Sequence, residues 1–198
     1  YYGIVTNISA APIDSCFVRG DSAGGLISNI GIYNLGQGSI PSPPTLSITN
    51  TRVAGYFSLQ HFLNFYAGRA SMCDCDLIAY DGPPRSPVIV RNFHGDYVKI
   101  RRTSIWNWGQ YGVLTGHIGS AVPDLGWLAP DSGNNDLTTS ASGSSWKFVW
   151  DTDCGSCSSP IVRAKYNQWY MVPPSSRFSN NVNRIPYLPV LPPKVAAG

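Results

Sequence analysis

Apolar and polar residues alternate in many short runs along the chain. Residues 45–59 alternate through Leu46, Ile48, Val53 and Phe57, and residues 146–150 do the same between Trp146 and Trp150. A period of two predicts strands with one buried face. Further short apolar runs are separated by segments rich in Gly, Pro, Asn and Ser, and they lie at residues 13–18, 76–80, 88–90, 97–100 and 112–115. We find neither heptads nor an internal repeat, and many short strands at this spacing predict a sandwich or a pair of barrels.

The connections between these runs are polar. Residues 129–145 are rich in Ser, Thr, Asn and Gly and predict an exposed connector or a long hairpin loop. Residues 160–164 and 168–172 are predicted to form a hairpin through residues 165–167. Residues 186–198 contain four prolines and are predicted to be a tail or linker.

Composition supports an all-β protein. Only 13% of the 198 residues are charged, about half of the ~25% that is typical of soluble domains. Helix surfaces are usually covered by Lys and Glu, so this composition argues against a helical protein. Six Trp and 11 Tyr residues favour strands. The length fits one ordinary domain or two small ones.

Charge and hydropathy restrict the possible partners. The net charge of +3 is too small to indicate nucleic-acid binding. The cluster of Lys99, Arg101 and Arg102 is interpreted as the solvent-exposed face of a strand. No run approaches the ~18 apolar residues of a membrane span. Five cysteines are an odd number, which favours a reducing compartment over a complete disulfide framework.

The segment around Cys157 is the one best suited to catalysis. A cysteine nucleophile needs a sharp loop, inward-turned backbone N–H groups and a nearby base. Gly155 allows the positive φ that turns such N–H groups inward, and Pro160 opens the next apolar run. From these residues alone, a turn that carries a free cysteine without a catalytic role remains the alternative.

This segment resembles the nucleophile loop of the chymotrypsin-fold cysteine proteinases of positive-strand RNA viruses, the picornain, 3C-like and potyviral nuclear-inclusion types. The matching residues are Thr152, Gly155, Cys157 and Pro160, whereas Ser158 stands where the family usually has Gly. Residues 55–63 resemble the family's strand that leads into its histidine, and residues 76–80 resemble its catalytic-acid strand. The order His, Asp, Cys is also that of the family, and the resemblance covers about residues 51–178.

The resemblance implies a mechanism. Cys157 would attack the scissile carbonyl, His61 would transfer the proton, and Asp76 would orient the imidazole. Asp74 is the alternative acid, because the strand period decides which carboxylate faces His61. The N–H groups of Gly155, Ser156 and Cys157 would hold the oxyanion.

The resemblance also implies a fold and a setting. The fold would be two antiparallel, chymotrypsin-like β-barrels, formed by residues 1–115 with an extra N-terminal arm and by residues 116–185, with the active site in the cleft between them. The protein would be an endopeptidase that processes a viral polyprotein in the host cell cytoplasm. Its partner would be a peptide or polyprotein substrate, and it would need no cofactor.

Substrate choice follows from the same resemblance. Thr152 matches a residue of the family's S1 pocket, but the position of the family's S1 histidine falls at Pro173 or Pro174. Neither proline offers a side-chain donor, although Ser175 could still supply a hydroxyl. We therefore expect no selection of glutamine at P1 by a histidine.

Two alternatives come from other classes of protein. Low charge, many aromatic residues and Pro-rich loops also suit a structural all-β capsid or spike domain of a virus. Four thiolates with C-x-C and C-x-x-C spacing could instead bind zinc tetrahedrally, and these are Cys73, Cys75, Cys154 and Cys157.

Overall fold

The computed structural model describes most of the strands of the chain and several of its connections. The described residues are 2–6, 12–20, 30–35, 45–55, 61–67, 69–79, 88–90, 98–106, 111–115, 123–138, 147–151, 162–169, 188 and 191.

The described strands form three parallel sheets, which we call A, B and C. Sheet A is ordered β1 (Tyr2–Thr6), β4 (Ile30–Leu35), β7 (His61–Ala67), β10 (Val88–Val90), β13 (Tyr111–Thr115) and β16 (Lys147–Asp151). Sheet B is ordered β14 (Pro123–Asp124), β11 (Val98–Arg101), β8 (Arg69–Cys73), β5 (Thr45–Thr49) and β2 (Ile13–Asp14). Sheet C is ordered β17 (Gln168–Trp169), β15 (Asp136–Thr138), β12 (Ser104–Trp106), β9 (Asp76–Ala79), β6 (Arg52–Gly55) and β3 (Phe17–Gly20).

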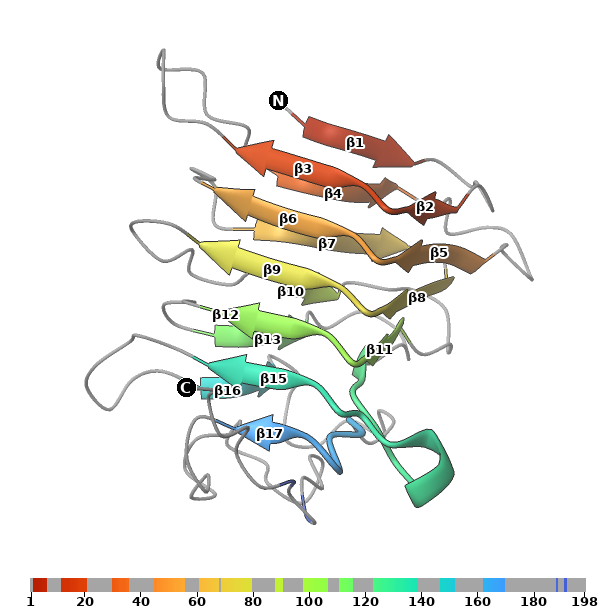
Figure 1. Cartoon of the computed structure of the whole chain (residues 1–198), viewed down its shortest axis with the longest axis vertical. Helices are drawn as coiled ribbons and strands as arrows, with labels where there is room; N and C mark the ends of the chain where they lie inside the picture. The colour runs from red at the N-terminus through yellow and green to blue at the C-terminus, as the bar shows by residue number, and fades with distance from the viewer. Residues whose placement is uncertain are drawn as a thin grey trace.

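The chain visits the sheets in the fixed order A, B, C and then begins again. Each round is one coil, and strands of successive coils pair in parallel, so the molecule is a parallel β-helix. Figure 1 shows the coils stacked from β1 at one end to β17 at the other. In the last coil, sheet B is represented by an isolated parallel bridge between Asp124 and Arg163. Residues 129–131 form a short 3-10 helix, η1 (Ala129–Asp131).

The core lies inside the coils and is built from columns of apolar side chains. Because the strands pair in register, the same inward position recurs one coil further on. One column runs along sheet C through the buried residues Val18, Val53, Leu77, Ile105, Leu137 and Trp169. A second runs along sheet B through Ile13, Ile48, Met72 and Ile100. Burying these side chains against one another supplies the main stabilisation of the stack.

The predicted pair of antiparallel barrels is wrong. Every strand pairing among the described residues is parallel, and strands that follow one another within a coil lie in different sheets. The alternation of residues 45–59 was informative about strands, since β5 and β6 lie there. It carries no information about the partner of a strand, because an inward and outward alternation is common to barrels and solenoids.

Two local predictions, for residues 160–172 and for residues 129–145, are also wrong. Residues 162–169 do not form a hairpin, because Arg163 bridges Asp124 and β17 pairs with β15, both in parallel. The polar segment 129–145 contains η1 and β15 in its described part. Strands on either side of residue 115 share sheets, since β12 pairs with β15 and β13 pairs with β16.

In the described part of the chain, no helix has the length and apolarity that crossing a membrane requires.

The parallel register can be tested by cross-linking. Thr49 and Cys73 are register partners on neighbouring strands of sheet B, where strands lie about 4.8 Å apart. We expect Thr49→Cys to be joined to Cys73 by a short bifunctional thiol reagent, detected as a linked peptide by mass spectrometry. Thr45→Cys is the control, because Thr45 is the partner of Arg69 at the other end of the same strand pair. Equal yields of the link to Cys73 from the two variants would contradict the register.

Candidate functional site

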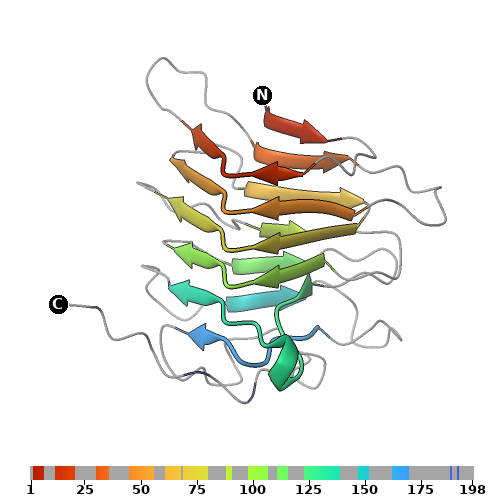
Figure 2. The same cartoon turned by 45° about the vertical axis from the view of Figure 1, so that its right-hand side comes forward.

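The most regular feature of the molecule is the tight corner between sheets B and C. In each coil one residue at this corner has a positive φ, although none of these residues is glycine, and the six are Ser15, Asn50, Asp74, Arg102, Asn134 and Tyr166. A left-handed backbone usually costs a non-glycine residue about 1–2 kcal/mol. Figure 2 shows the resulting sharp bend between the sheet B and sheet C strands in coil after coil.

The residue after each bend turns inward and bonds to the corner. Thr51 Oγ1 donates to the carbonyl of Thr49 at 2.8 Å, and Thr103 Oγ1 donates to the carbonyl of Arg101 at 2.9 Å. Cys75 Sγ lies 3.2 Å from the carbonyl of Cys73 in the same arrangement. A small polar donor two residues after the strand end therefore gives the corner carbonyl a second bond, because the same carbonyl also accepts the backbone N–H of the bend residue in the preceding coil.

In the last two coils asparagines take over this position. Asn135 and Asn167 are fully buried. Asn167 Oδ1 accepts bonds from the backbone N–H of Asn135 at 3.1 Å and from its Nδ2 at 2.9 Å. Asn135 Oδ1 in turn accepts from the N–H of Thr103 at 3.0 Å. These amides connect three successive coils through side chains as well as through strand pairing.

One excursion leaves this corner. The chain departs at Gly126, forms η1 and returns at Gly133, and we call residues 126–132 the excursion. A Cβ at Gly133 would lie 1.8 Å from the carbonyl oxygen of Leu125, and one at Gly126 would lie 2.3 Å from the N of Gly133. The two glycines let the departing and returning segments pass at this close approach.

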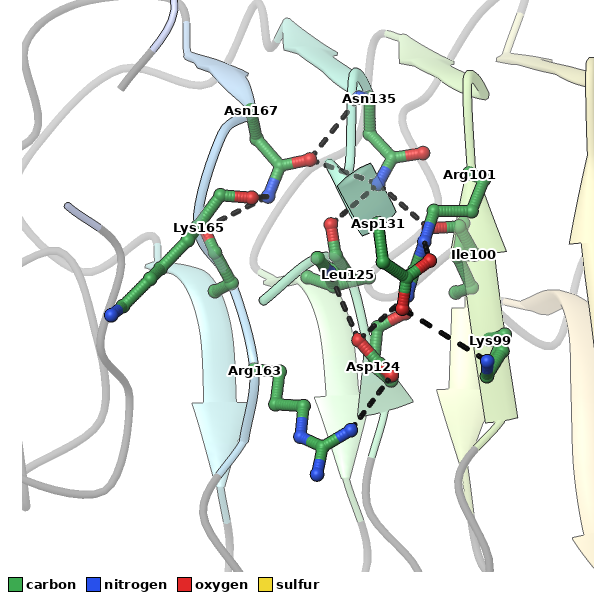
Figure 3. Close-up of polar contacts among 12 residues, drawn as sticks. Lys99, Ile100, Arg101, Asp124, Leu125, Asp131, Asn135, Arg163, Lys165 and Asn167 are labelled. Atoms are coloured by element: carbon green, nitrogen blue, oxygen red, sulfur yellow. Dashed lines mark hydrogen bonds and ion pairs between the residues drawn. The ribbon is translucent and has the colours of Figure 1, made fainter. Parts of the chain in front are cut away.

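A buried arginine holds the excursion against sheet B (Figure 3). Arg101, whose side chain is 9% exposed, is 3.0 Å from Asp124 Oδ1 and 2.9 Å from Asp131 Oδ2 through the same terminal nitrogen. Its Nε also donates to Asp131 Oδ1 at 3.0 Å, so the pairing with Asp131 is bidentate. Arg101 thus joins β11, β14 and η1.

Other cations surround this cluster. Arg163 lies 3.4 Å from Asp124 Oδ2, and Lys99 lies 3.9 Å from Asp131 Oδ2. The Trp127 ring of the excursion contacts Arg163 and Lys165, with Arg163 Cζ 5.5 Å and Lys165 Nζ 4.4 Å from its centroid. Both are within the range of cation–π attraction. The charged groups of this corner are therefore engaged with one another.

The electrostatics follow from these contacts. The hydrogen bonds from Arg101 lower the pKa of Asp131 below its usual value, against an opposing effect of partial burial. Arg102, the residue after Arg101, bonds both carboxylate oxygens of the exposed Asp74 in the preceding coil at 2.7 Å, and this lowers the pKa of Asp74. Both carboxylates stay ionised at neutral pH, so their pairs persist there.

The described part of the predicted catalytic set lies in one coil. His61 opens β7 in sheet A, and Asp76 opens β9 in sheet C with an exposed side chain. Asp74, the alternative acid, is the left-handed corner residue and pairs with Arg102. The prediction that one of these carboxylates orients His61 stays a prediction.

The remaining predicted site residues lie outside the described residues. They are Thr152, Cys154, Gly155, Ser156, Cys157, Pro173, Pro174 and Ser175.

The C-x-C half of the predicted zinc set belongs to the corner. Cys75 is buried at the inward position, and burial raises its pKa to about 11. Cys73 is half-buried at the end of β8, accepts a bond from Arg102 at 2.7 Å, and has a pKa raised chiefly by burial. Among the described residues, no group of three or more His, Cys, Asp or Glu side chains could hold a metal ion.

Comparison of the chain with protein-family models, with curated proteins and with solved structures finds no match. The assignment of a function therefore depends on the geometry of this molecule.

Sequence reasoning missed the corner, although a signal for it is present. A residue before the bend, the bend residue and a small polar donor recur as Asp14-Ser15-Cys16, Thr49-Asn50-Thr51, Cys73-Asp74-Cys75, Arg101-Arg102-Thr103, Gly133-Asn134-Asn135 and Lys165-Tyr166-Asn167. The donor of each triplet is Cys, Thr or Asn, so a search for identical residues does not find it.

Arg101 and its neighbour Arg102 form a matched pair for mutation. Arg101→Met leaves the fully buried Asp124 with Arg163 at 3.4 Å, and we expect a loss of about 3–5 kcal/mol in the free energy of unfolding. Arg102→Met removes an exposed pair and is expected to cost at most about 1 kcal/mol. Urea denaturation of both variants measures the difference. Similar losses for the two would contradict the central role of Arg101.

The Asp131 pairing predicts a dependence of stability on pH. Its pKa is lowered in the folded protein, so its stabilising effect is present above the unfolded value near 3.8 and is lost as the pH falls through the folded value. We expect Asp131→Asn to reduce the loss of unfolding free energy between about pH 5 and pH 2.5 relative to the wild type. Asp14 and Asp74 also have lowered pKa values and act in both proteins. An unchanged pH profile would show that the Arg101–Asp131 contact does not contribute.

Proposed function

We propose that the protein is a structural, non-catalytic β-helical domain, in which the rigid stack of coils holds the variable connecting segments in place. The observation that carries this proposal is the use of the reactive and charged side chains of the B–C corner in holding one coil to the next. This conclusion keeps the class of protein that the sequence offered as the alternative to an enzyme, and the viral origin of that alternative stays a prediction.

The charged groups support this proposal by their partners. Arg101 joins β11, β14 and η1, and Arg102 joins the corners of two successive coils through Asp74. A catalytic or ligand-binding charge is instead held toward a substrate position. Charges that neutralise one another across coils hold neighbouring coils together.

The thiols support it in the same way. A nucleophilic cysteine needs a lowered pKa, because the thiolate is the reactive form. Cys73 and Cys75 have raised pKa values, and the Sγ of Cys75 lies near the carbonyls of Ile48 and Cys73. These two residues therefore have the properties of structural cysteines.

The connections suit the role of a support. At the B–C corner the chain turns within a few residues, except at the excursion, whereas the connections from sheet C to sheet A and from sheet A to sheet B have unequal lengths. In solenoid proteins, insertions of variable length map to loops, and such loops often carry binding. A rigid stack with variable connections separates the stable part of the molecule from the variable part.

The cysteine-endopeptidase function stays a prediction. Its nucleophile, Cys157, lies outside the described residues, and its proposed framework of two antiparallel barrels is not the fold of this chain. The experiment that tests the structural proposal therefore has to examine Cys157 directly.

The test is the alkylation rate of each cysteine in the folded protein at neutral pH, followed by mass spectrometry. We expect Cys75 to react slowest, because it is 3% exposed and its pKa is about 11. We expect Cys73 to react more slowly than a free thiol. Under the structural proposal Cys154 and Cys157 react no faster than a free thiol of a model peptide.

Peptide cleavage by the wild type and by Cys157→Ala provides the second measurement, with Cys154→Ala as the matched control. No cleavage by any of the three proteins agrees with the structural proposal. Rapid labelling of Cys157, with cleavage that Cys157→Ala abolishes and Cys154→Ala retains, would reject it in favour of the endopeptidase.

A further inference from the structure

A backbone hydrogen bond links Leu191, one of the two described residues of the Pro-rich tail, to the last described coil. The N–H of Leu191 donates to the carbonyl of Asn167 at 2.9 Å. Asn167 is the buried corner residue of the coil that contains β17, and β17 is the edge strand of sheet C among the described residues. The tail therefore reaches the corner at the end of the stack.

This bond repeats a bond made by every earlier pair of coils. In each case the residue that follows the corner in one coil donates its N–H to the corner carbonyl of the coil before. The earlier bonds are Arg52 to Cys16 at 2.9 Å, Asp76 to Thr51 at 3.1 Å, Ser104 to Cys75 at 2.9 Å, Asp136 to Thr103 at 3.0 Å and Gln168 to Asn135 at 2.8 Å. Leu191 makes the next bond in the series, from the position that a further coil would occupy.

The sequence of the tail fits this position. Leu188 precedes Pro189, and Leu191 precedes Pro192 and Pro193. A residue before proline is restricted to extended backbone, which suits a strand. Prolines have no N–H, so a strand rich in proline offers few donors to a next strand, and natural sheets use proline to protect their edges.

We propose that the segment around Leu191 acts as a terminal strap, which takes the place of a further coil and prevents a strand of a second copy of this chain from pairing at the same edge. The strap satisfies the corner carbonyl of Asn167, and its prolines leave few donors for further pairing. Without it, the corner carbonyl of Asn167 loses the donor that it has in every earlier coil, and unsatisfied groups at the edge of a sheet associate with strands of other chains.

The first measurement uses the wild-type protein. Amide hydrogen exchange of Leu191 is expected to be slowed about tenfold or more relative to an unstructured peptide of the same sequence. Exchange at the unstructured rate would overturn the proposal, because the N–H of Leu191 would then not be held by Asn167.

The second measurement compares two full-length variants. Leu191→Pro removes the donating N–H, whereas Leu188→Pro makes the same change at the exposed Leu188 and is the matched control. Light scattering coupled to size-exclusion chromatography is expected to show an increase of about twofold or more in the mass of Leu191→Pro with concentration, while Leu188→Pro keeps the mass of the wild type. Equal masses of Leu191→Pro and the wild type at all concentrations would overturn the proposal.

A third variant covers the case in which Leu191→Pro does not fold, as judged by circular dichroism. Pro192→Ala with Pro193→Ala keeps the N–H of Leu191 and adds two new donors beside it. If the prolines block further pairing, this variant is expected to self-associate more than the wild type, with the exchange of Leu191 still slow. A mass equal to that of the wild type would show that the prolines do not protect this edge.

Discussion

The fold depends on one constraint, which is that the chain must turn sharply between sheets B and C at the same height in every coil. The turn places a non-glycine residue in the left-handed region, and the N–H of that residue donates to a corner carbonyl of the next coil. An inward Thr or Cys adds a second bond to such a carbonyl, and the buried Asn135 joins its corner to the neighbouring coils. Because the corners are stacked and bonded, the strands on either side stay in register, and the apolar columns of sheets B and C can form. The core packs well because the corners align the coils.

The charged cluster extends this principle to the place where the corner is interrupted. The excursion separates Leu125 from Asn134, so the bend of that coil is not made by adjacent residues. Gly126 and Gly133 let the two ends of the excursion pass closely, and Arg101 binds both the strand before the excursion and η1 within it. A buried ion pair is weak evidence of stabilisation in general, because desolvation opposes the attraction. Here its role is geometric, since a bidentate guanidinium fixes η1 relative to sheet B.

The sequence predicted the strands better than their arrangement. Alternation located β5, β6 and β16, and short apolar runs located β9, β10, β11 and β13 to within about two residues. It did not reveal that Asp14 and Phe17 lie on different sheets, because a two-residue bend without glycine or proline resembles a continuous strand. The coils also escaped a search for repeats, since their connections differ in length and the corner donor varies among Cys, Thr and Asn. Cys73-x-Cys75 illustrates the result: its spacing suggested metal ligands, whereas it is one corner among six, with one thiol at a strand end and the other in the core.

The close approach of Gly126 and Gly133 determines where the chain can accept insertions. The N of Gly133 lies so near Gly126 that the segment between them closes a loop, and the backbone on both sides keeps its bonds to the neighbouring coils through Gly126, Gly133 and Leu125. The number of residues in that loop therefore does not affect the spacing between neighbouring coils. Residues can be inserted there without displacing the strands that follow, provided that Asp131 keeps its bonds to Arg101, so the excursion is a suitable point for grafting a foreign peptide onto the side of the molecule.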